Sequence, residues 1–258
     1  MRKCHLEDCT WEEIESRRSE VEDTIIVPVG SVEQHGAHLP LGTDTYAAMS
    51  IAERTAEKED CLIAPPVYYG WSPHHMVLPG TVTIRPEILV EYVYDVLESL
   101  AQHGFRRFVL LNGHRIVNVP WLQLTAERAK RLLKVKVIVA DPAYLSKTLA
   151  RTTDLGKIGH ADEIETSHML HRYPSLVHME KAVDFASPKP SLLDIDPSNV
   201  NDSLCYVPSS EEEMAESARE GAGCSGSPSR SSAKKGEEYF EWVTDRLAEA
   251  VRLLKGNE

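Results

Sequence analysis

The sequence has few cysteines, and they are not arranged for a disulfide framework or a thiolate metal site. The five cysteines are odd in number and widely scattered, and none of them stand in C-x-x-C spacing. Disulfide-rich secreted domains and thiolate zinc sites both depend on clustered cysteines. We therefore expect these residues to be plain thiols.

Long apolar runs are also absent. No stretch of eighteen apolar residues occurs, and the N-terminal segment MRKCHLEDCTWEEIESR lacks the apolar core of a secretory signal. A membrane-spanning helix and a signal peptide each require such a run. The sequence therefore predicts a cytoplasmic protein with neither feature.

Basic residues are outnumbered by acidic ones. The chain has 28 Lys and Arg against 40 Asp and Glu, which gives a formal net charge of −12. Proteins that bind nucleic acids or anionic membranes need a basic surface to meet phosphate groups. The balance disfavours both as partners and favours a small, soluble substrate.

Apolar residues are plentiful, at 42% of 258 residues, so the chain can bury a large core as one domain or two smaller ones. Short β-branched runs alternate with helical patterns: strands are predicted at 24–29, 62–68, 108–111 and 135–140, and helices at 46–58, 86–103, 120–132 and 235–254. This alternation predicts parallel strands. We expect one domain over 1–258, a three-layer α/β/α sandwich with a mostly parallel sheet.

One segment departs from the alternation. Residues 208–232 are dominated by Ser, Glu, Gly and Ala, a composition that predicts a loop. Loops of this length are either functional or passive surface excursions. The sequence leaves open whether this loop forms a lid over a binding site.

Metal-ligating side chains gather directly behind the first predicted strand. Glu33, His35, His38 and Asp44 lie within twelve residues of one another, in the segment VPVGSVEQHGAHLPLGTDTY. Carboxylates and imidazoles are ligands that hold zinc, manganese or iron. Polar surface loops also carry charged clusters, but this density predicts a metal site.

Two later segments supply further candidate ligands. His114 follows the predicted strand at 108–111 in the tripeptide NGH, and His160 and Glu165 lie in the segment GHADEIETSH. In open α/β sheets, the loops at the carboxyl ends of the strands converge on a shared ligand site. We therefore expect these side chains to meet at one edge of the sheet.

These segments resemble the creatininase (creatinine amidohydrolase) family. The matching motifs are GSVEQHG, HLP, TD, SPHHMVLPGT, NGH and ETS, in the family's order, and SPSRSSAKKG resembles the family's C-terminal segment. The resemblance implies a creatininase-like fold, hydrolase activity and a homo-oligomer, in many members a hexamer. It also implies two divalent metal ions per chain, for which zinc, manganese and iron all suit an oxygen and nitrogen ligand set.

The resemblance implies a role for individual residues. Glu33 corresponds to a ligand of one metal, and His35 corresponds to a ligand of the other. Asp44 corresponds to the carboxylate that bridges both metals, and His114 corresponds to the histidine of NGH. The fifth ligand differs among branches, which use either a Glu two residues after that histidine or the Glu of ETS. Because Ile116 stands at the first position and cannot bind metal, we expect Glu165. His160 matches a histidine near the metal-activated water, where an imidazole can move a proton.

The segment after NGH departs from the family. Many relatives carry glycines there, whereas this chain reads NGHRIVN, with Arg115 next to His114. An arginine can hold a carboxylate, a carbonyl or vicinal oxygens with two hydrogen bonds. We expect Arg115 to act in catalysis on an oxygen-rich or acidic substrate; the alternative is that it turns outward into a surface ion pair. This departure puts creatinine in doubt as the substrate.

Residues around the SPHH motif are candidates for substrate binding. We expect His75, Trp71 and Tyr69 to line the pocket, although aromatic residues at a strand end are often part of the core. The remaining candidate histidines are expected to be structural or bystanders: His38, His103, His168 and His171.

The resemblance implies hydrolysis of a small cyclic substrate of the cyclic-amide type, with water activated between two metals. The motif NGHRIVN, however, resembles the branch of 3-dehydro-scyllo-inosose hydrolases, which implies C–C cleavage in a cyclic diketo-inositol instead. A non-catalytic, metal-binding relative is a third possibility. The presence of all five candidate ligands disfavours it.

Overall fold

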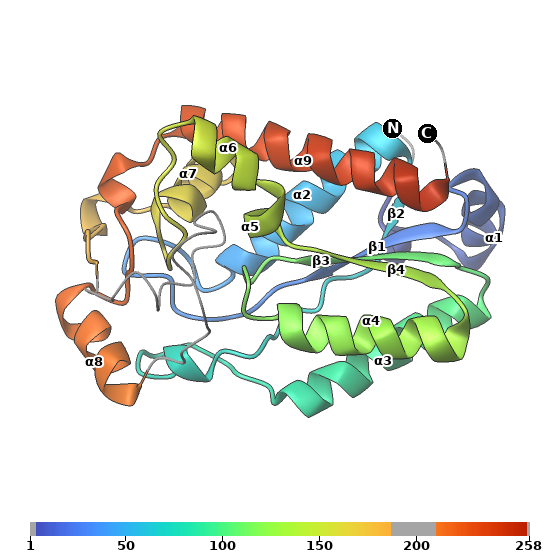
Figure 1. The fold of residues 1–258 in the computed structure, drawn as a ribbon, viewed down its shortest axis with the longest axis horizontal. Coiled ribbons are helices and arrows are strands. Elements are labelled where there is room, and N and C mark those ends of the chain that lie inside the picture. Colours follow the sequence, from blue (N-terminus) through green and yellow to red (C-terminus); the bar gives the residue numbers. More distant parts are fainter. Residues whose placement is uncertain (1–3, 187–209, 257–258) are drawn as a thin grey trace.

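A parallel sheet forms the centre of the protein (Figure 1). The computed structural model describes residues 4–186 and 210–256. The strands pair in the order β2-β1-β3-β4, and every pair is parallel. Their bounds are Thr24–Val29 for β1, Leu62–Ile63 for β2, Arg107–Asn112 for β3 and Lys136–Ala140 for β4.

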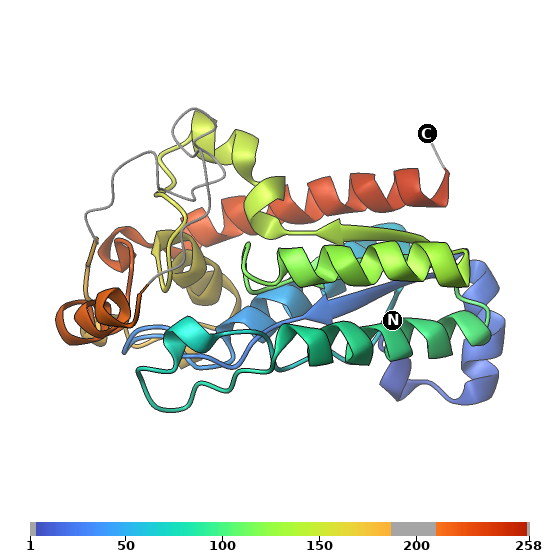
Figure 2. The same cartoon turned by 60° about the horizontal axis from the view of Figure 1, so that its bottom comes forward.

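Helices cover both faces of the sheet (Figures 1 and 2). Ile25 and Val27 of β1 belong to the core formed with α3 and α4, whereas Ile26 belongs to the core formed with α2, α7 and α9. Successive strand residues point to opposite faces, so one buried strand serves two cores. The predicted three-layer α/β/α sandwich is therefore confirmed. The bounds of these helices are Pro86–Gln102, Val119–Leu133, Thr43–Glu59, Glu163–Arg172 and Ala233–Lys255.

Shorter elements complete the described part of the chain. The helix α1 precedes the sheet, α5 and α6 follow β4, and α8 lies between α7 and α9. Their bounds are Trp11–Glu20, Pro142–Leu145, Lys147–Thr152 and Glu211–Glu220. Single 3-10 turns lie at Leu6–Asp8, Pro73–His75, Pro174–Leu176, Met179–Lys181 and Pro228–Arg230.

The predicted strand at 62–68 is much shorter in the structure. β2 ends at Ile63, and Pro65 and Pro66 follow almost immediately. Proline has no N–H to donate to a neighbouring strand, so two prolines interrupt the ladder. Only Val67 pairs again, in an isolated bridge with Val29 among the described residues.

The prediction of a loop over 208–232 was wrong for Glu211–Glu220, which forms α8. The Ser210 side chain accepts a hydrogen bond from the Glu213 N–H, and the Glu213 carboxylate accepts one from the Ser210 N–H. This capping box satisfies two donors at the helix start and is visible in the sequence as Ser-x-x-Glu. Residues 208 and 209 lie outside the described residues, and a lid role for the segment stays a prediction.

Two expectations from the composition can be compared with the structure. Across the described part of the chain, no helix combines the length and apolar character needed to cross a bilayer. Among the described residues, Cys4, Cys9, Cys61 and Cys224 form no disulfide. Cys205 lies outside the described residues.

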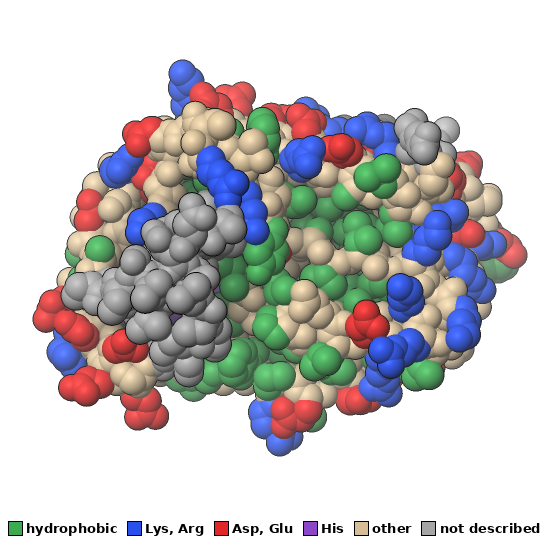
Figure 3. Space-filling view, viewed as in Figure 1, with side chains coloured by type: hydrophobic (Ala, Val, Ile, Leu, Met, Phe, Trp, Pro, Cys, Tyr) green, Lys and Arg blue, Asp and Glu red, His purple; other side chains and the backbone are tan. Residues whose placement is uncertain are grey.

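One edge of the sheet is only partly covered. In β4, the side chains of Val137, Ile138 and Val139 are half-buried, whereas β1 is buried throughout. Figure 3 shows hydrophobic side chains gathered on this face, where β4 runs between α4 and α9. This apolar face is a candidate contact surface for the expected self-association.

Close packing of α9 on α7 generates a first prediction. A Cβ added at Gly236 would lie 1.9 Å from the carbonyl oxygen of Ser167. Although alanine favours helices over glycine, we expect Gly236→Ala to lower the free energy of unfolding by about 1–3 kcal/mol, because the helices must separate. Urea unfolding measures this change, and the exposed neighbour variant Glu237→Ala should stay within about 0.5 kcal/mol of the parent. A Gly236→Ala variant at least as stable as the parent would show that the helices do not touch there.

Candidate metal centre

The candidate ligands converge at the carboxyl edge of the sheet. Glu33 and His35 follow β1, and His114 follows β3. Asp44 and Glu165 lie in the first turns of α2 and α7. The first four residues are buried, and the Glu165 side chain is 10% exposed. The structure thus brings together all five residues that the sequence suggested as ligands.

Asp44 lies between two histidines. Its Oδ1 is 3.1 Å from His35 Nε2, and its Oδ2 is 3.1 Å from His114 Nδ1. The other ring nitrogen of His114 is 3.2 Å from Glu33 Oε2, and Glu165 Oε2 is 3.9 Å from His35 Nε2. Carboxylate oxygens and ring nitrogens therefore face one another at short range, as they do around shared cations.

Buried oxygens test whether this cluster fits a metal. Glu33 Oε1 and Asp44 Oδ2 are buried, and neither makes a well-aligned hydrogen bond with the described residues, although His114 Nδ1 lies 3.1 Å from Asp44 Oδ2. A buried carboxylate oxygen is costly unless it is paired or coordinates a cation. Oxygen and imidazole donors suit divalent zinc, manganese and iron. The residues therefore fit the metals that the sequence suggested.

The pKa values of the cluster indicate how its charges are balanced without a metal. Burial raises the pKa of Glu33 to about 7. Burial opposes protonation of His35 and His114, but the carboxylates of Asp44 and Glu33 outweigh it and raise their pKa values to about 10 and about 9. The two histidines thus hold protons against the carboxylates. A divalent ion would take the place of those protons.

The side chain of Gln34 fixes the protonation of His75. Gln34 Oε1 accepts a hydrogen bond from Gly36 N at 3.0 Å, and Nε2 donates to Gly223 O at 3.0 Å, so the orientation of the amide is set. Nε2 therefore also donates to His75 Nδ1 at 2.9 Å. The ring proton of His75 must then sit on Nε2, which faces Glu33 Oε1 at 3.4 Å. In this arrangement His75 presents an N–H to Glu33, while Glu33, His75 and His160 are also close enough together to share an ion.

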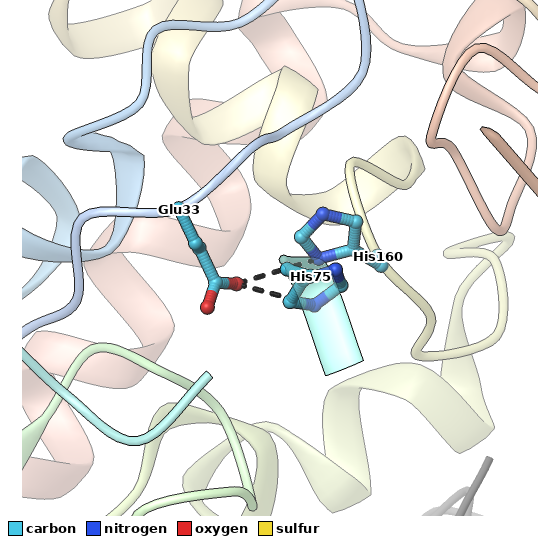
Figure 4. Close-up of side chains that lie close together, drawn as sticks. All are labelled: Glu33, His75 and His160. Carbon is cyan, nitrogen blue, oxygen red and sulfur yellow. Dashed lines mark ion pairs between the residues drawn. The ribbon is translucent and has the colours of Figure 1, made fainter. Parts of the chain in front are cut away.

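His160 presents a different nitrogen to the same carboxylate (Figure 4). Its Nε2 contacts the Gln34 carbonyl oxygen, which can only accept, so the proton is on Nε2. Nδ1 is then unprotonated and lies 3.7 Å from Glu33 Oε1. Burial, followed by the charge of His35, lowers the pKa of His160 well below its usual value. His160 therefore offers a neutral nitrogen to the cluster.

Arg115 lies inside the protein, so the alternative of an outward surface pair is wrong. Its Nη2 is 2.8 Å from Glu165 Oε1 and 2.7 Å from Asp162 Oδ2, and its Nε donates to Glu165 Oε1 at 3.0 Å. The residue is 8% exposed. Protein carboxylates thus occupy Nε and Nη2, whereas the buried Nη1 makes no hydrogen bond with the described residues.

A family model matches this chain over nearly its whole length. The model is described as creatininase, creatinine amidohydrolase, and it matches residues 7–251. The chain belongs to the creatininase family. The family suggested by the motifs of the sequence is therefore confirmed.

Proteins similar in sequence to this chain carry the names of different hydrolases. A 3-dehydro-scyllo-inosose hydrolase of Thermotoga maritima is 33% identical over 188 residues, which is 70% of this chain and 60% of the relative. A creatinine amidohydrolase of Pseudomonas putida is 32% identical over 194 residues, or 69% of this chain and 75% of the relative. The match with the first relative thus spans less than two thirds of that protein.

Solved creatininase structures share the fold. A crystal structure of creatinine amidohydrolase superposes with a TM-score of 0.81 at 28% identity, covering 98% of both chains. A structure described as Creatininase Mn and a mutant creatininase of Zn–Zn type each superpose with a TM-score of 0.77, at 28% and 27% identity and with 98% of both chains covered. The fold inferred from the sequence is therefore that of creatininases.

The aromatic candidates for substrate binding lie at different depths in this creatininase-family chain. Trp71 packs partly against the core and lies with its ring 6.4 Å from that of His74, which stacks at 5.9 Å on His114. Tyr69 is 48% exposed. The substrate-binding roles of Trp71, Tyr69 and His75 stay predictions.

The remaining histidines have structural contacts. His38 Nε2 is 2.9 Å from Thr166 Oγ1, and His168 Nε2 is 2.9 Å from Ser50 Oγ. His103 is the C-cap of α3, and the ring of His171 packs on Phe240. These contacts agree with the structural or bystander roles expected from the sequence.

Three polar residues beside the cluster are not predicted from the sequence. Gln34 orients His75, while Ser31 Oγ lies 3.3 Å from Glu33 Oε2 and 2.7 Å from Ser72 Oγ. Each of the three stands inside a motif shared with the family, GSVEQHG or SPHHMVLPGT. Their position in those motifs was the signal that could have found them.

The buried carboxylate oxygens of Glu33 and Asp44 lead to a prediction about metal content. Replacing Glu33 by Gln removes a buried negative charge from the cluster, so we expect Glu33→Gln to retain less than half of the parent's divalent metal after dialysis. Elemental analysis measures the content. The matched control is Glu53→Gln, at a carboxylate that is 36% exposed and 3.4 Å from His5 Nε2, which should bind metal like the parent. Equal metal in all three proteins would exclude Glu33 as a ligand.

Proposed function

We propose that this protein is a hydrolase with two divalent metal ions, held by Glu33, His35, Asp44, His114 and Glu165. The observation that carries the proposal is the buried arrangement in which Asp44 bridges two imidazoles at 3.1 Å each. On either side of it stand Glu33, whose buried Oε1 makes no well-aligned hydrogen bond with the described residues, and Glu165. The number of metals and their identity belong to the proposal.

Bound metals would supply the chemistry that the side chains lack. Two adjacent divalent ions lower the pKa of a water molecule and polarise a substrate carbonyl, so that attack and charge stabilisation are provided together. Creatininase structures described as Mn and as Zn–Zn type support either metal.

The protein's own residues would then move protons and hold the ligands. His160 has a neutral Nδ1 beside Glu33 and a backbone fixed to Ser225 by two hydrogen bonds of 2.8 Å. It would accept a proton from the attacking water and return it to the leaving group, as a general base and acid. His75, whose ring stacks on that of His160 at 3.8 Å, would hold Glu33 Oε1 from the same side (Figure 4).

The substrate that we propose is a small cyclic compound with a carbonyl at the point of attack. Similarity to the creatinine amidohydrolase of Pseudomonas putida favours a cyclic amide. Opening such a ring adds water across one C–N bond. Thr166 and Ser167 are not needed as nucleophiles, because both are buried and Thr166 is hydrogen-bonded to His38.

A second candidate is C–C cleavage of a cyclic diketo-inositol. It is favoured by the similarity to the 3-dehydro-scyllo-inosose hydrolase of Thermotoga maritima and by the motif NGHRIVN. The chemistry is continuous with amide hydrolysis, because attack on a ring carbonyl can expel an amine or a stabilised enolate. The two reactions differ only in the leaving group.

A paired assay tests the proposal. Purified protein is loaded with Mn²⁺ or Zn²⁺ and incubated separately with creatinine and with 3-dehydro-scyllo-inosose, and mass spectrometry detects a product heavier than the substrate by one water. We expect about two metals per chain and turnover of one substrate, with removal of metal by a chelator lowering the rate at least 100-fold and metal restoring it. Two metals with turnover of neither compound would reject both substrates. Fewer than one metal after loading would favour a non-catalytic relative.

We further propose a cytoplasmic homo-oligomer. The half-buried apolar strand β4 supports self-association, because an exposed apolar edge strand is otherwise a liability in water. Light scattering coupled to gel filtration should give a mass well above the 28.9 kDa of one chain. A monomer at micromolar concentration would refute the oligomer.

A further inference from the structure

The two oxygens of Glu165 have different partners. Oε1 is held by Arg115, through Nε at 3.0 Å and Nη2 at 2.8 Å. Oε2 accepts a hydrogen bond from Ala161 N at 2.8 Å and is the oxygen nearest to His35 Nε2, at 3.9 Å. One oxygen is thus occupied by a guanidinium, and the other faces the candidate metal ligands.

Arg115 also grips the start of the helix that carries Glu165. Asp162 is the N-cap of α7, and its Oδ1 accepts hydrogen bonds from Ile164 N and Glu165 N, each at 2.9 Å. Its Oδ2 accepts hydrogen bonds from Gly159 N and Arg115 Nη2, each at 2.7 Å. The guanidinium therefore fixes both the carboxylate of Glu165 and the backbone from which it projects.

The turn that carries Arg115 is itself held rigidly. Asp141 Oδ2 accepts hydrogen bonds from Ile116 N at 2.7 Å and from Asn112 Nδ2 at 2.8 Å. Ile116 has a φ of 68°, a left-handed conformation that a β-branched residue adopts only when its surroundings impose it. The turn that places Arg115 against α7 therefore contains a strained backbone conformation at Ile116.

We propose that Arg115 is a positioning residue of the metal centre, which holds Glu165 so that Oε2 alone is presented to the metal bound by His35. This role rests on the proposed function. It also accounts for the sequence of the turn, since Ile116 offers no donor and the ligand must come from α7, a separate element. Arg115 is the side chain that ties the NGH turn to that element.

The charge of Arg115 and its hydrogen bonds have opposite effects on metal affinity. A cation beside a metal site repels the metal, so loss of its charge alone would tighten metal binding. Loss of its hydrogen bonds would free Glu165 to rotate and would weaken binding. We expect the second effect to win, because Asp162 and Glu165 already neutralise the guanidinium. Residues behind a ligand typically change metal affinity 10- to 100-fold.

The test compares Arg115→Met with the parent by competition against a chromogenic chelator, which measures the dissociation constants for Zn²⁺ at both sites. We expect one site to weaken about 10- to 100-fold and the other to change less than about threefold. The control is Arg17→Met, which removes an arginine of α1 paired at 2.8 Å with Asp60; α1 precedes β1 and lies at the opposite end of the sheet from the cluster (Figure 1). It should lower stability to urea without altering either constant.

Arg115→Lys keeps the charge but has a single donor group, so it should weaken the same site by less than Arg115→Met does. It also serves as the deciding variant if Arg115→Met does not fold. Unchanged or tighter binding in the folded Arg115 variants would overturn the positioning role, and so would an equal loss at both sites. A parent protein with fewer than two sites would instead overturn the proposed function, and this role with it.

Discussion

Buried negative charge is the constraint on which the rest of the site depends. Glu33, Asp44, Asp162 and Glu165 lie together at the carboxyl edge of the sheet, and burying carboxylates is expensive unless each is paired. The protein balances them in two ways. Imidazoles face Glu33 and Asp44, whereas the guanidinium of Arg115 serves Asp162 and Glu165. A metal ion can replace the protons on the imidazoles, because imidazoles release protons. The charge of Arg115 stays, because a guanidinium does not release its proton.

The sheet topology produces this crowding directly. β1 and β3 are neighbours in register from Thr24 with Arg107 to Val29 with Asn112, so the residues after both strands emerge side by side. Gly113 then lets the backbone after β3 approach α2 so closely that a Cβ would lie 2.0 Å from the Asp44 carbonyl oxygen. A larger residue would push Asp44 away from His114. The close packing of this turn on α2 therefore requires the glycine of the NGH motif, independently of the chemistry of the site.

Much of this arrangement could be predicted from the sequence, and the failures have physical causes. β-branched runs and helix periodicity located the strands and the long helices, because these patterns depend on neighbours in the chain. β2 was overestimated because its apolar run continues past Pro65 and Pro66 into residues that no longer pair. The composition of 208–232 predicts a loop, but the capping box of Ser210 and Glu213 starts the helix α8. The ligand cluster followed from motifs, but the partners of Arg115 come from a segment about fifty residues away, which local patterns do not reveal.

The burial of Arg115 changes what can be inferred about substrate. Nε and Nη2 of Arg115 are engaged with carboxylates, Nη1 makes no hydrogen bond with the described residues, and the cavity that Arg115 lines beside Tyr239 is only about 20 Å³. That space admits about one water molecule and no ring. We therefore expect selectivity to come from other side chains around the ligands, for which the row of rings from His114 through His74 to Trp71 is a candidate. An arginine next to a metal ligand in the sequence is not evidence for an anionic substrate until its partners are known.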